Sequence, residues 1–126
     1  MHEMSIAMAV VEQVARAARP PERHTVTSVR LRIGELAGVV DEALRFSFDL
    51  ACEGTPLAGA RLETEPVAGR ARCADCAARW ATGMPPHLWC RECGSARCEL
   101  VAGRELDIVD VRWAPRPAES LAGEAG

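Results

Sequence analysis

The chain of 126 residues has no tyrosine, and its aromatic residues are limited to two phenylalanines and three tryptophans. A core with so few aromatic side chains must be built from valine, leucine, isoleucine and alanine. A short segment of such a core gains from a metal cross-link. The length leaves room for one compact domain, or for a small core with a metal-stabilised appendage.

Lysine is also absent, so all fifteen basic residues are arginines, and the net charge is -3. No stripe of basic residues runs along the chain. Because the neutralisation of phosphates supplies most of the affinity for nucleic acid, we expect no nucleic-acid partner.

Long hydrophobic runs are missing as well. No apolar segment approaches the roughly 20 residues that a membrane-spanning helix needs, and no basic leader precedes an apolar stretch at the N-terminus. We therefore expect a cytoplasmic protein without membrane association. Thiols stay reduced in that compartment, so the six cysteines indicate metal binding before disulfides.

Helical and strand periodicities predict a small α+β core. A helix over residues 4–18 is expected to bury one face, formed by Ala7, Val10, Val11, Val14 and Ala18. Alternation over residues 25–33 predicts a half-buried strand with Thr27, Val29, Leu31 and Ile33 on its apolar face. A second helix over residues 41–51, with Asp41 as its N-terminal cap, and strands over residues 60–65 and 105–113 complete the core.

Residues 70–103 interrupt this core with a segment of little periodicity, which we expect to form a zinc-binding domain. Residues 1–69 and 104–113 then form the α/β domain, with glycine hinges where the chain enters and leaves the insertion. Residues 114–126, rich in proline, alanine, glycine and glutamate, are expected to be a disordered tail.

The insertion contains two CxxC pairs, Cys73–Cys76 and Cys90–Cys93, with thirteen residues between them. Each pair can turn two thiolates toward one point, so the two pairs predict a tetrahedral Zn²⁺ site that stabilises the insertion. Iron is the alternative metal for such sulfur ligands. Of the other two cysteines, Cys98 is expected to pack as a small apolar residue, with replacement of one ligand as its alternative, and Cys52 is expected in the core.

The charge of the insertion argues against a nucleic-acid-binding ribbon. Its five arginines and three acids leave a charge of +2 over residues 70–103, which the -2 charge of a zinc tetrathiolate offsets. A redox dithiol would need one CxxC pair at a helix start, not two pairs that frame a loop. The zinc is therefore expected to be structural.

The chain begins Met1-His2-Glu3. The amine of Met1 and the backbone and imidazole nitrogens of His2 can form fused chelate rings, and nitrogen donors in a square plane favour Ni(II) or Cu(II). Glu3 can add a backbone nitrogen or a carboxylate. Any chain that starts this way has the same atoms, but here the predicted helix follows at once, so the terminus is expected to be anchored.

Together these motifs resemble the hydrogenase-maturation nickel chaperones of the HypA/HybF family. The resemblance covers nearly the whole chain and rests on residues 1–5, 33–40, 53–55, 103–106 and both CxxC pairs. It implies two helices packed on a three-stranded sheet, with a Cys₄ zinc ribbon inserted before the last strand.

The resemblance also implies a non-catalytic role. Ni²⁺ would be a transient cargo, bound by Met1 and His2 with help from Glu3, and handed on with a hydrogenase-maturation GTPase to the large subunit of [NiFe]-hydrogenase. Some members also serve urease. Asp41 lies where some members bring an acid near the nickel, although the helix cap is the preferred interpretation. Some members carry histidines beside the zinc cysteines, whereas the nearest one here is His87, expected to be an exposed loop residue.

Two other function classes remain open at this point. A zinc-ribbon module that binds a partner protein would explain the four cysteines but not the N-terminus. An enzyme is disfavoured, because four cysteines leave a zinc ion no open position for catalysis. A homodimer through an edge strand is left open.

Overall fold

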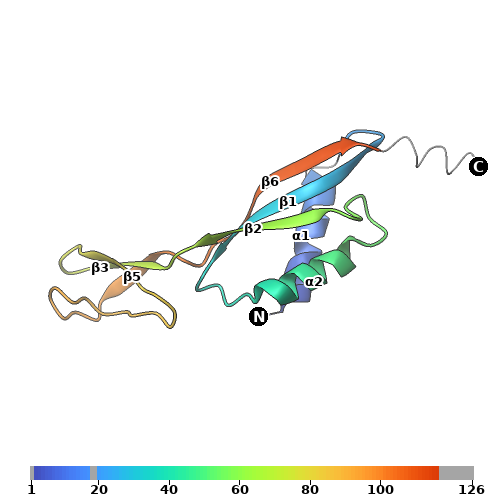
Figure 1. Ribbon diagram of the computed structural model, residues 1–126. Coiled ribbons are helices and arrows are strands. Elements are labelled where there is room, and N and C mark those ends of the chain that lie inside the picture. The colour runs from blue at the N-terminus through green and yellow to red at the C-terminus, as the bar shows by residue number, and fades with distance from the viewer. Residues whose placement is uncertain (1, 18–19, 117–126) are drawn as a thin grey trace, which may run out of the picture. The chain divides into compact units, whose positions relative to one another are not determined.

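The computed structural model describes residues 2–17 and 20–116 (Figure 1). In chain order its elements are α1 (Glu3–Ala17), β1 (His24–Gly34), α2 (Asp41–Cys52), β2 (Arg61–Val67), β3 (Arg70–Cys73), β4 (Arg79–Ala81), β5 (Cys98–Ala102) and β6 (Leu106–Pro115). One three-stranded sheet has the order β2-β1-β6 and a second has the order β4-β3-β5. The predicted α+β class, with two helices, a three-stranded sheet and a cysteine-rich insertion before the last strand, is confirmed.

The residues divide into two compact units. The first unit comprises Met1–Arg30, Val40–Glu63 and Ile108–Gly126, and the second comprises Leu31–Val39 and Thr64–Asp107. The second unit is called the zinc unit below, because it contains both CxxC pairs. It extends beyond the predicted insertion on both sides, and the assignment of residues 70–103 to a separate domain stays a prediction.

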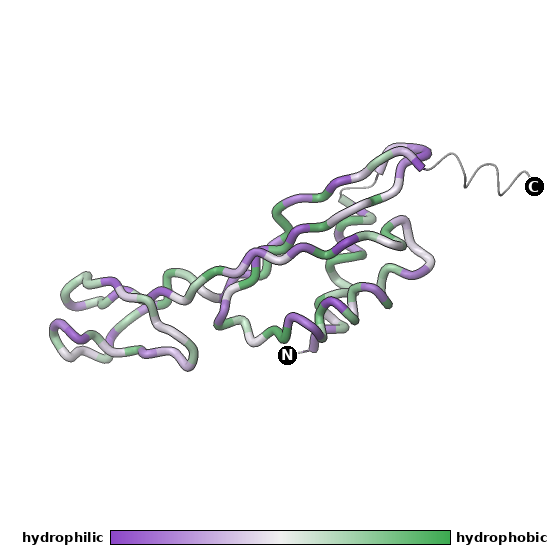
Figure 2. Tube along the Cα trace, viewed as in Figure 1, coloured by the Kyte–Doolittle hydropathy of each residue, from purple (hydrophilic) through white to green (hydrophobic). Residues whose placement is uncertain are grey.

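In the first unit, α1 and α2 pack against each other on one side of the sheet (Figure 1). Hydrophobic and hydrophilic residues alternate along the strands of this sheet (Figure 2). The buried side chains of the first unit come from both helices, from two strands and from the loop after α2. They include Ala7, Val10, Val11, Val14, Val26, Val29, Leu44, Phe48, Leu57 and Leu62.

Burial confirms most of the predicted apolar faces and corrects one of them. Four of the five residues predicted for the face of α1 are buried, and the fifth, Ala18, lies outside the described residues. In β1 the prediction for Thr27 is wrong, because Thr27 is exposed and Val26 is buried instead. The buried positions Val26 and Val29 are three residues apart, so the alternation is interrupted between them.

The start of α2 differs from the prediction. Val40 occupies the N-cap position with φ -88° and ψ 116°, and no side chain caps the helix there. Asp41 is already the first helical residue, and its Oδ2 accepts a hydrogen bond from Nε of Arg45 at 2.8 Å. The predicted cap at Asp41 is therefore wrong, because a capping side chain must come from the residue before the first helical turn.

In the zinc unit, β3 pairs with β4 and β5 in antiparallel fashion, with Ala71 opposite Trp80 and opposite Leu100. Cys73 at the end of β3 lies opposite Cys98 of β5. This small sheet ends where the first cysteine pair begins, so it presents that pair on a fixed backbone.

Three glycines of the zinc unit, Gly34, Gly69 and Gly103, approach one another closely; they are called the glycine junction below. A Cβ added at Gly34 would lie 2.0 Å from the carbonyl carbon of Gly103, and one added at Gly103 would lie 2.6 Å from Cα of Gly69. Leu36 N–H donates to the Gly103 carbonyl at 2.7 Å, and Gly69 N–H donates to Oε1 of Glu35 at 2.6 Å. Gly69 and Gly103, at the ends of the insertion, were predicted as hinges; in the structure the absence of a side chain at all three glycines allows backbones to meet.

Strand β6 is an edge strand with no fully buried residue. Leu106, Val109 and Trp113 are each more than a third exposed. The strand continues through Pro115, past the predicted start of the disordered tail at Ala114; residues 117–126 lie outside the described part of the chain. In the part that the structure describes, no helix has the length and apolar character needed to cross a membrane.

Candidate metal centres

The structure brings the two predicted cysteine pairs together. The Sγ atoms of Cys73, Cys76, Cys90 and Cys93 all lie within 4.8 Å of one another. The Sγ atoms of Cys73 and Cys93 are 3.6 Å apart, and those of Cys76 and Cys90 are 3.5 Å apart. Four thiolates bonded to one Zn²⁺ at ~2.3 Å have sulfurs ~3.8 Å apart, so this cluster has the size that a tetrahedral zinc site requires.

The two pairs have the same backbone geometry. Cys73 N–H donates to the Ala78 carbonyl at 2.8 Å, and the Cys73 carbonyl accepts from Ala77 N–H at 3.0 Å. In the second pair, Cys90 N–H donates to the Ser95 carbonyl at 2.8 Å, and its carbonyl accepts from Gly94 N–H at 2.9 Å. Each pair therefore forms a closed turn that presents both thiols on one side.

The residue after each pair adopts a left-handed conformation, with φ 65° at Ala77 and 75° at Gly94. Glycine was predicted to suit this position after the second pair, and it does so without steric cost. Alanine at the equivalent position of the first pair is disfavoured by its Cβ. The metal-site geometry thus holds one alanine in a strained conformation.

Local hydrogen bonds change the acidity of the thiols. The Cys76 N–H lowers the pKa of Cys73 to about 7, with a smaller contribution from the Asp75 N–H, which lies 3.4 Å from the Cys73 sulfur. The Ala78 amide lowers the pKa of Cys76, but hydrogen bonds to the neighbouring thiols and burial raise it more, to about 12. The thiols are close enough to influence one another's pKa, so their protons leave in successive steps that belong to the whole cluster, and zinc binding must release those protons.

A polar bridge that the sequence did not reveal connects the two turns. Asp75, inside the first pair, accepts a hydrogen bond from the hydroxyl of Ser95, just after the second pair. Its other oxygen accepts from Arg97 at 2.8 Å. The sequence signals of this bridge are Asp75 within the first pair and Ser95 and Arg97 after the second. Such residues are too common near cysteines to predict the bridge.

The remaining cysteines lie outside this cluster. Cys98 is half-buried, and its thiol donates to the Leu88 carbonyl at 3.2 Å. Cys52 is buried, as predicted, and its burial raises the pKa of the thiol to about 11, with a smaller contribution from the charge of Asp49. In the described part of the chain, neither belongs to the group that could hold a metal.

Two of the predicted nickel residues, His2 and Glu3, lie at the start of α1. Met1 lies outside the described residues, and His2 is exposed. The backbone carbonyl of His2 accepts a hydrogen bond from Ile6 N–H at 3.2 Å, so the helix begins directly after this residue. The terminus is thus anchored to α1 from His2 onward, as the sequence suggested.

Glu3 connects this terminus to the start of α2. Its Oε2 accepts a hydrogen bond from Val40 N–H at 3.1 Å, and this hydrogen bond lowers the pKa of the Glu3 carboxyl. Asp41 follows Val40 directly, so residues 2–3 and Asp41 belong to one corner of the first unit. The Asp41 carboxylate is engaged by Arg45 at 2.8 Å. The contact between Glu3 and Val40 could not be predicted from the sequence, because 37 residues separate them.

His87, expected as an exposed loop residue, is only partly exposed. Its ring lies against Trp89, with ring centroids 3.5 Å apart, and its Nε2 is buried without a hydrogen-bond partner. The expectation of an exposed residue was wrong, because the ring of Trp89, tilted by 41° to the imidazole, covers part of it.

Comparison with known proteins gives a consistent picture. The family model described as "HypA: Hydrogenase/urease nickel incorporation, metallochaperone, hypA" matches residues 1–113. The chain is 60% identical over 114 residues to the hydrogenase maturation factor HypA of Streptomyces avermitilis, covering 90% of this chain and 87% of that protein. It is 44% identical over 114 residues to the hydrogenase maturation factor HypA of Desulfosudis oleivorans, covering 88% of this chain and 96% of that protein.

Solved structures share the fold at low sequence identity. The solution structure titled as that of HypA protein superimposes with a TM-score of 0.66 at 20% identity, covering 90% of this chain and 97% of that one. The solution structure of the Ni metallochaperone HypA from Helicobacter pylori gives 0.61 at 19% identity, covering 92% and 100%. With the match over residues 1–113 and the relative at 60% identity, the chain belongs to the HypA family of hydrogenase and urease nickel-incorporation metallochaperones.

Proposed function

We propose that this protein binds Ni(II) as a transient cargo at Met1, His2 and Glu3 and delivers it during the maturation of [NiFe]-hydrogenase. The start of α1 carries the proposal. The first N–H groups of a helix have no partner within the helix, so deprotonation of the His2 amide for metal binding costs no helical hydrogen bond. His2 is exposed, and its backbone carbonyl is tied to the helix that begins at Glu3 by the hydrogen bond from Ile6 N–H.

Charge at this corner suits a divalent cation. The positive end of the α1 dipole disfavours a metal ion, but the deprotonated amide and the Glu3 carboxylate offset it. The Val40 amide lowers the pKa of Glu3, so this carboxylate is ionised at neutral pH. A shallow site of this kind binds with modest affinity, which suits a protein that must release its cargo.

Asp41 is a secondary candidate ligand. Its Oδ2 already accepts a hydrogen bond from Arg45, which competes with a metal ion for the carboxylate. We therefore assign the primary nickel bonds to Met1 and His2, with Glu3 assisting and Asp41 as a secondary ligand.

We assign Zn²⁺ to the four cysteines in a structural role. Four thiolates occupy all four coordination positions of a tetrahedral zinc ion and leave none for a substrate, which supports a non-catalytic function.

Family membership supports a hydrogenase-maturation GTPase and the large subunit of [NiFe]-hydrogenase as partners, with urease as a second client. The edge strands β2 and β6 leave room for a homodimer. Four reduced thiols are consistent with the cytoplasm.

A nickel titration tests the proposal. Three zinc-loaded proteins are compared: the chain that begins at Met1, the same chain with a short N-terminal extension, and His2→Ala. Nickel binding by the first protein alone, with zinc retained in all three, is the expected result. The affinity should also weaken as the pH falls, because the amine and amide release protons on binding. Equal binding by all three proteins would place nickel elsewhere and favour a zinc-ribbon interaction module.

A further inference from the structure

The loop between the two cysteine pairs exposes large apolar side chains. Within residues 82–90, called the zinc loop below, Met84 is 64% exposed, Trp89 54% and Leu88 39%. Exposed tryptophan and methionine side chains are enriched where proteins bind one another.

This exposure is not a sign of a loose loop. The Thr82 N–H donates to the Gly69 carbonyl at 2.9 Å, and the His87 N–H donates to the Thr82 carbonyl at 2.9 Å. The indole N–H of Trp80 in β4 donates to the His87 carbonyl at 2.7 Å. These hydrogen bonds tie the zinc loop to the strands beside it at Thr82 and His87, which reduces the entropy lost when a partner binds.

A cavity lies beside the zinc loop. It has a volume of about 530 Å³, and its lining includes Arg79, Trp80, Thr82, His87, Arg91 and Glu92. The wall thus combines an indole ring with two guanidinium groups. The buried Nε2 of His87 has no hydrogen-bond partner, so this lining also contains an unsatisfied polar atom.

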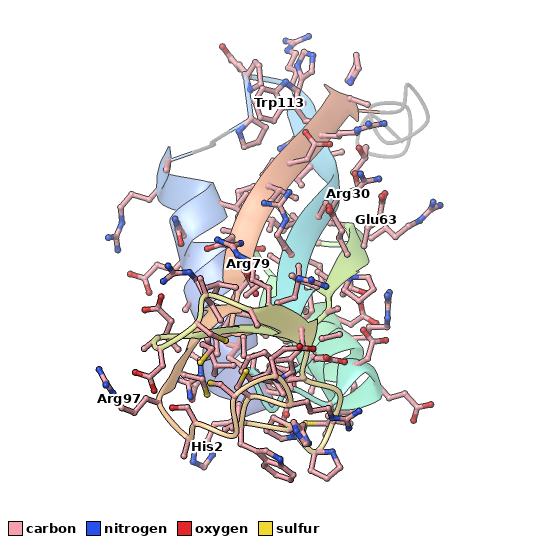
Figure 3. The ribbon with its side chains drawn as sticks, turned by 90° about the vertical axis from the view of Figure 1, so that its left-hand side faces the viewer. His2, Arg30, Glu63, Arg79, Arg97 and Trp113 are labelled. Atoms are coloured by element: carbon pink, nitrogen blue, oxygen red, sulfur yellow. The ribbon has the colours of Figure 1, made fainter. Side chains whose placement is uncertain are left out.

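The arginines at the cavity are available for a partner. Elsewhere in the zinc unit, Arg72 pairs with Glu99 at 3.1 Å and Arg97 pairs with Asp75 at 2.8 Å. Among the described residues, Arg79 and Arg91 have no acidic partner within 4.0 Å, and both are exposed. Figure 3 labels Arg79 together with the paired Arg97, and Arg30 beside its partner Glu63.

The two unpaired guanidinium groups at the cavity select the kind of partner. In the described lining, Arg79, Arg91 and Glu92 together leave a charge of +1. Cys90 lines the cavity too, and the -2 charge of a zinc tetrathiolate outweighs this +1, so the attraction for an acidic segment comes from short-range pairing with the guanidinium groups and the affinity for a short peptide is limited. A purely anionic ligand would leave Trp80 and Trp89 unused, and a purely apolar one would leave the arginines unused.

We propose that this cavity and the zinc loop form a docking site for a protein segment that alternates acidic and apolar residues. Carboxylates of the segment pair with Arg79 and Arg91, and its apolar side chains pack on Trp80 and Trp89. The metal centre would then have a second consequence, because it holds in place the loop that recognises a partner. The proposal does not depend on nickel binding at the N-terminus.

The three tryptophans provide the test. The zinc-loaded, ¹⁵N-labelled chain is titrated with the peptide acetyl-Glu-Leu-Asp-Leu-Glu-amide while the indole N–H signals are followed by NMR. We expect the signals of Trp80 and Trp89 to shift in a saturable way, and that of Trp113, in β6 of the first unit, to stay in place. The peptide acetyl-Lys-Leu-Lys-Leu-Lys-amide should leave all three signals unchanged.

Matched variants test whether Arg79 and Arg91 contribute to binding of the acidic peptide. The double change Arg79→Gln and Arg91→Gln should weaken binding of the acidic peptide about fivefold, the scale of two exposed ion pairs. Arg61→Gln, which removes an exposed arginine of β2 in the first unit, should leave the affinity unchanged. Zinc content is measured for each variant. If a variant loses zinc, the proposal is judged from the unmutated protein alone, by comparing its indole shifts with the acidic and the basic peptide.

Three results would overturn the proposal: no shift of Trp80 and Trp89, equal shifts with the acidic and the basic peptide, or equal loss of affinity in the Arg61 control. None of them bears on the nickel titration above, so the two proposals fail independently.

Discussion

Replacement of Gly34 by alanine tests how the glycine junction is built. The new Cβ would lie 2.0 Å from both the carbonyl carbon and the carbonyl oxygen of Gly103. Optimal carbon contacts are ~3.5–4.0 Å, so the backbones must separate by roughly 1 Å or more. The Gly34 N–H donates to the Glu105 carbonyl at 2.8 Å, and the Leu36 N–H donates to the Gly103 carbonyl at 2.7 Å. A separation of that size breaks or weakens both hydrogen bonds.

The expected cost follows from these contacts. Two weakened hydrogen bonds account for about 2 kcal/mol, at ~1 kcal/mol each. The overlap that remains after relaxation adds about 1 kcal/mol or more, as in other overpacked sites. We therefore expect Gly34→Ala to lower the free energy of unfolding by roughly 3 kcal/mol.

Gly38→Ala is the matched control. Gly38 has φ 73°, and a Cβ there would meet no atom within 4 Å. Only the left-handed conformation then opposes alanine, at about 1 kcal/mol. Urea unfolding of the zinc-loaded proteins, followed by tryptophan fluorescence, gives both values. A cost for Gly34→Ala no larger than that for Gly38→Ala would refute the close packing of the junction.

Three further predictions concern the cysteines and their surroundings. Burial raises the pKa of Cys52 to about 11 from its usual 9.0, so the neutral thiol is favoured in the folded state. The burial of the neutral thiol stabilises the folded state fully below pH 9, and this stabilisation, about 2–3 kcal/mol, is lost as the pH rises toward 11. The free energy of unfolding measured in urea should therefore decline across this range, and Cys52→Ala should remove that decline. Cys76→Ser should abolish tight zinc binding, whereas Cys98→Ser should keep the metal, because Cys98 bonds to the Leu88 carbonyl outside the cluster; metal analysis after dialysis distinguishes them. Ala77→Gly should raise the free energy of unfolding by about 0.5–1 kcal/mol, since it relieves φ 65°, and an unchanged urea midpoint would show that this turn is not strained.

Much of this protein could be predicted from residues that are close together in the sequence. The spacing within each CxxC pair indicated a zinc site, because both thiols of a pair belong to one turn. The buried face of α1 followed from helical periodicity at Ala7, Val10, Val11 and Val14. Where local geometry decides the outcome, as at these positions, the pattern of residue types was sufficient.

Other features depend on segments that are far apart in the chain. Val40 N–H donates to Glu3 across 37 residues. Asp41 pairs with Arg45 and does not cap α2, because the helix begins at Asp41 itself. The ring contact that half-buries His87 depends on the fold of the zinc loop, which brings Trp89 against the imidazole.

The sequence by itself determined the spacing of the cysteine pairs, the helix faces and the order of elements, because each is a property of neighbouring residues. Tertiary structure decided which backbones meet at the glycine junction, which arginines of the described residues lie without an acidic partner, and how residues 2–3 are held against the start of α2. These outcomes depend on distances between segments, and residue order alone does not set those distances.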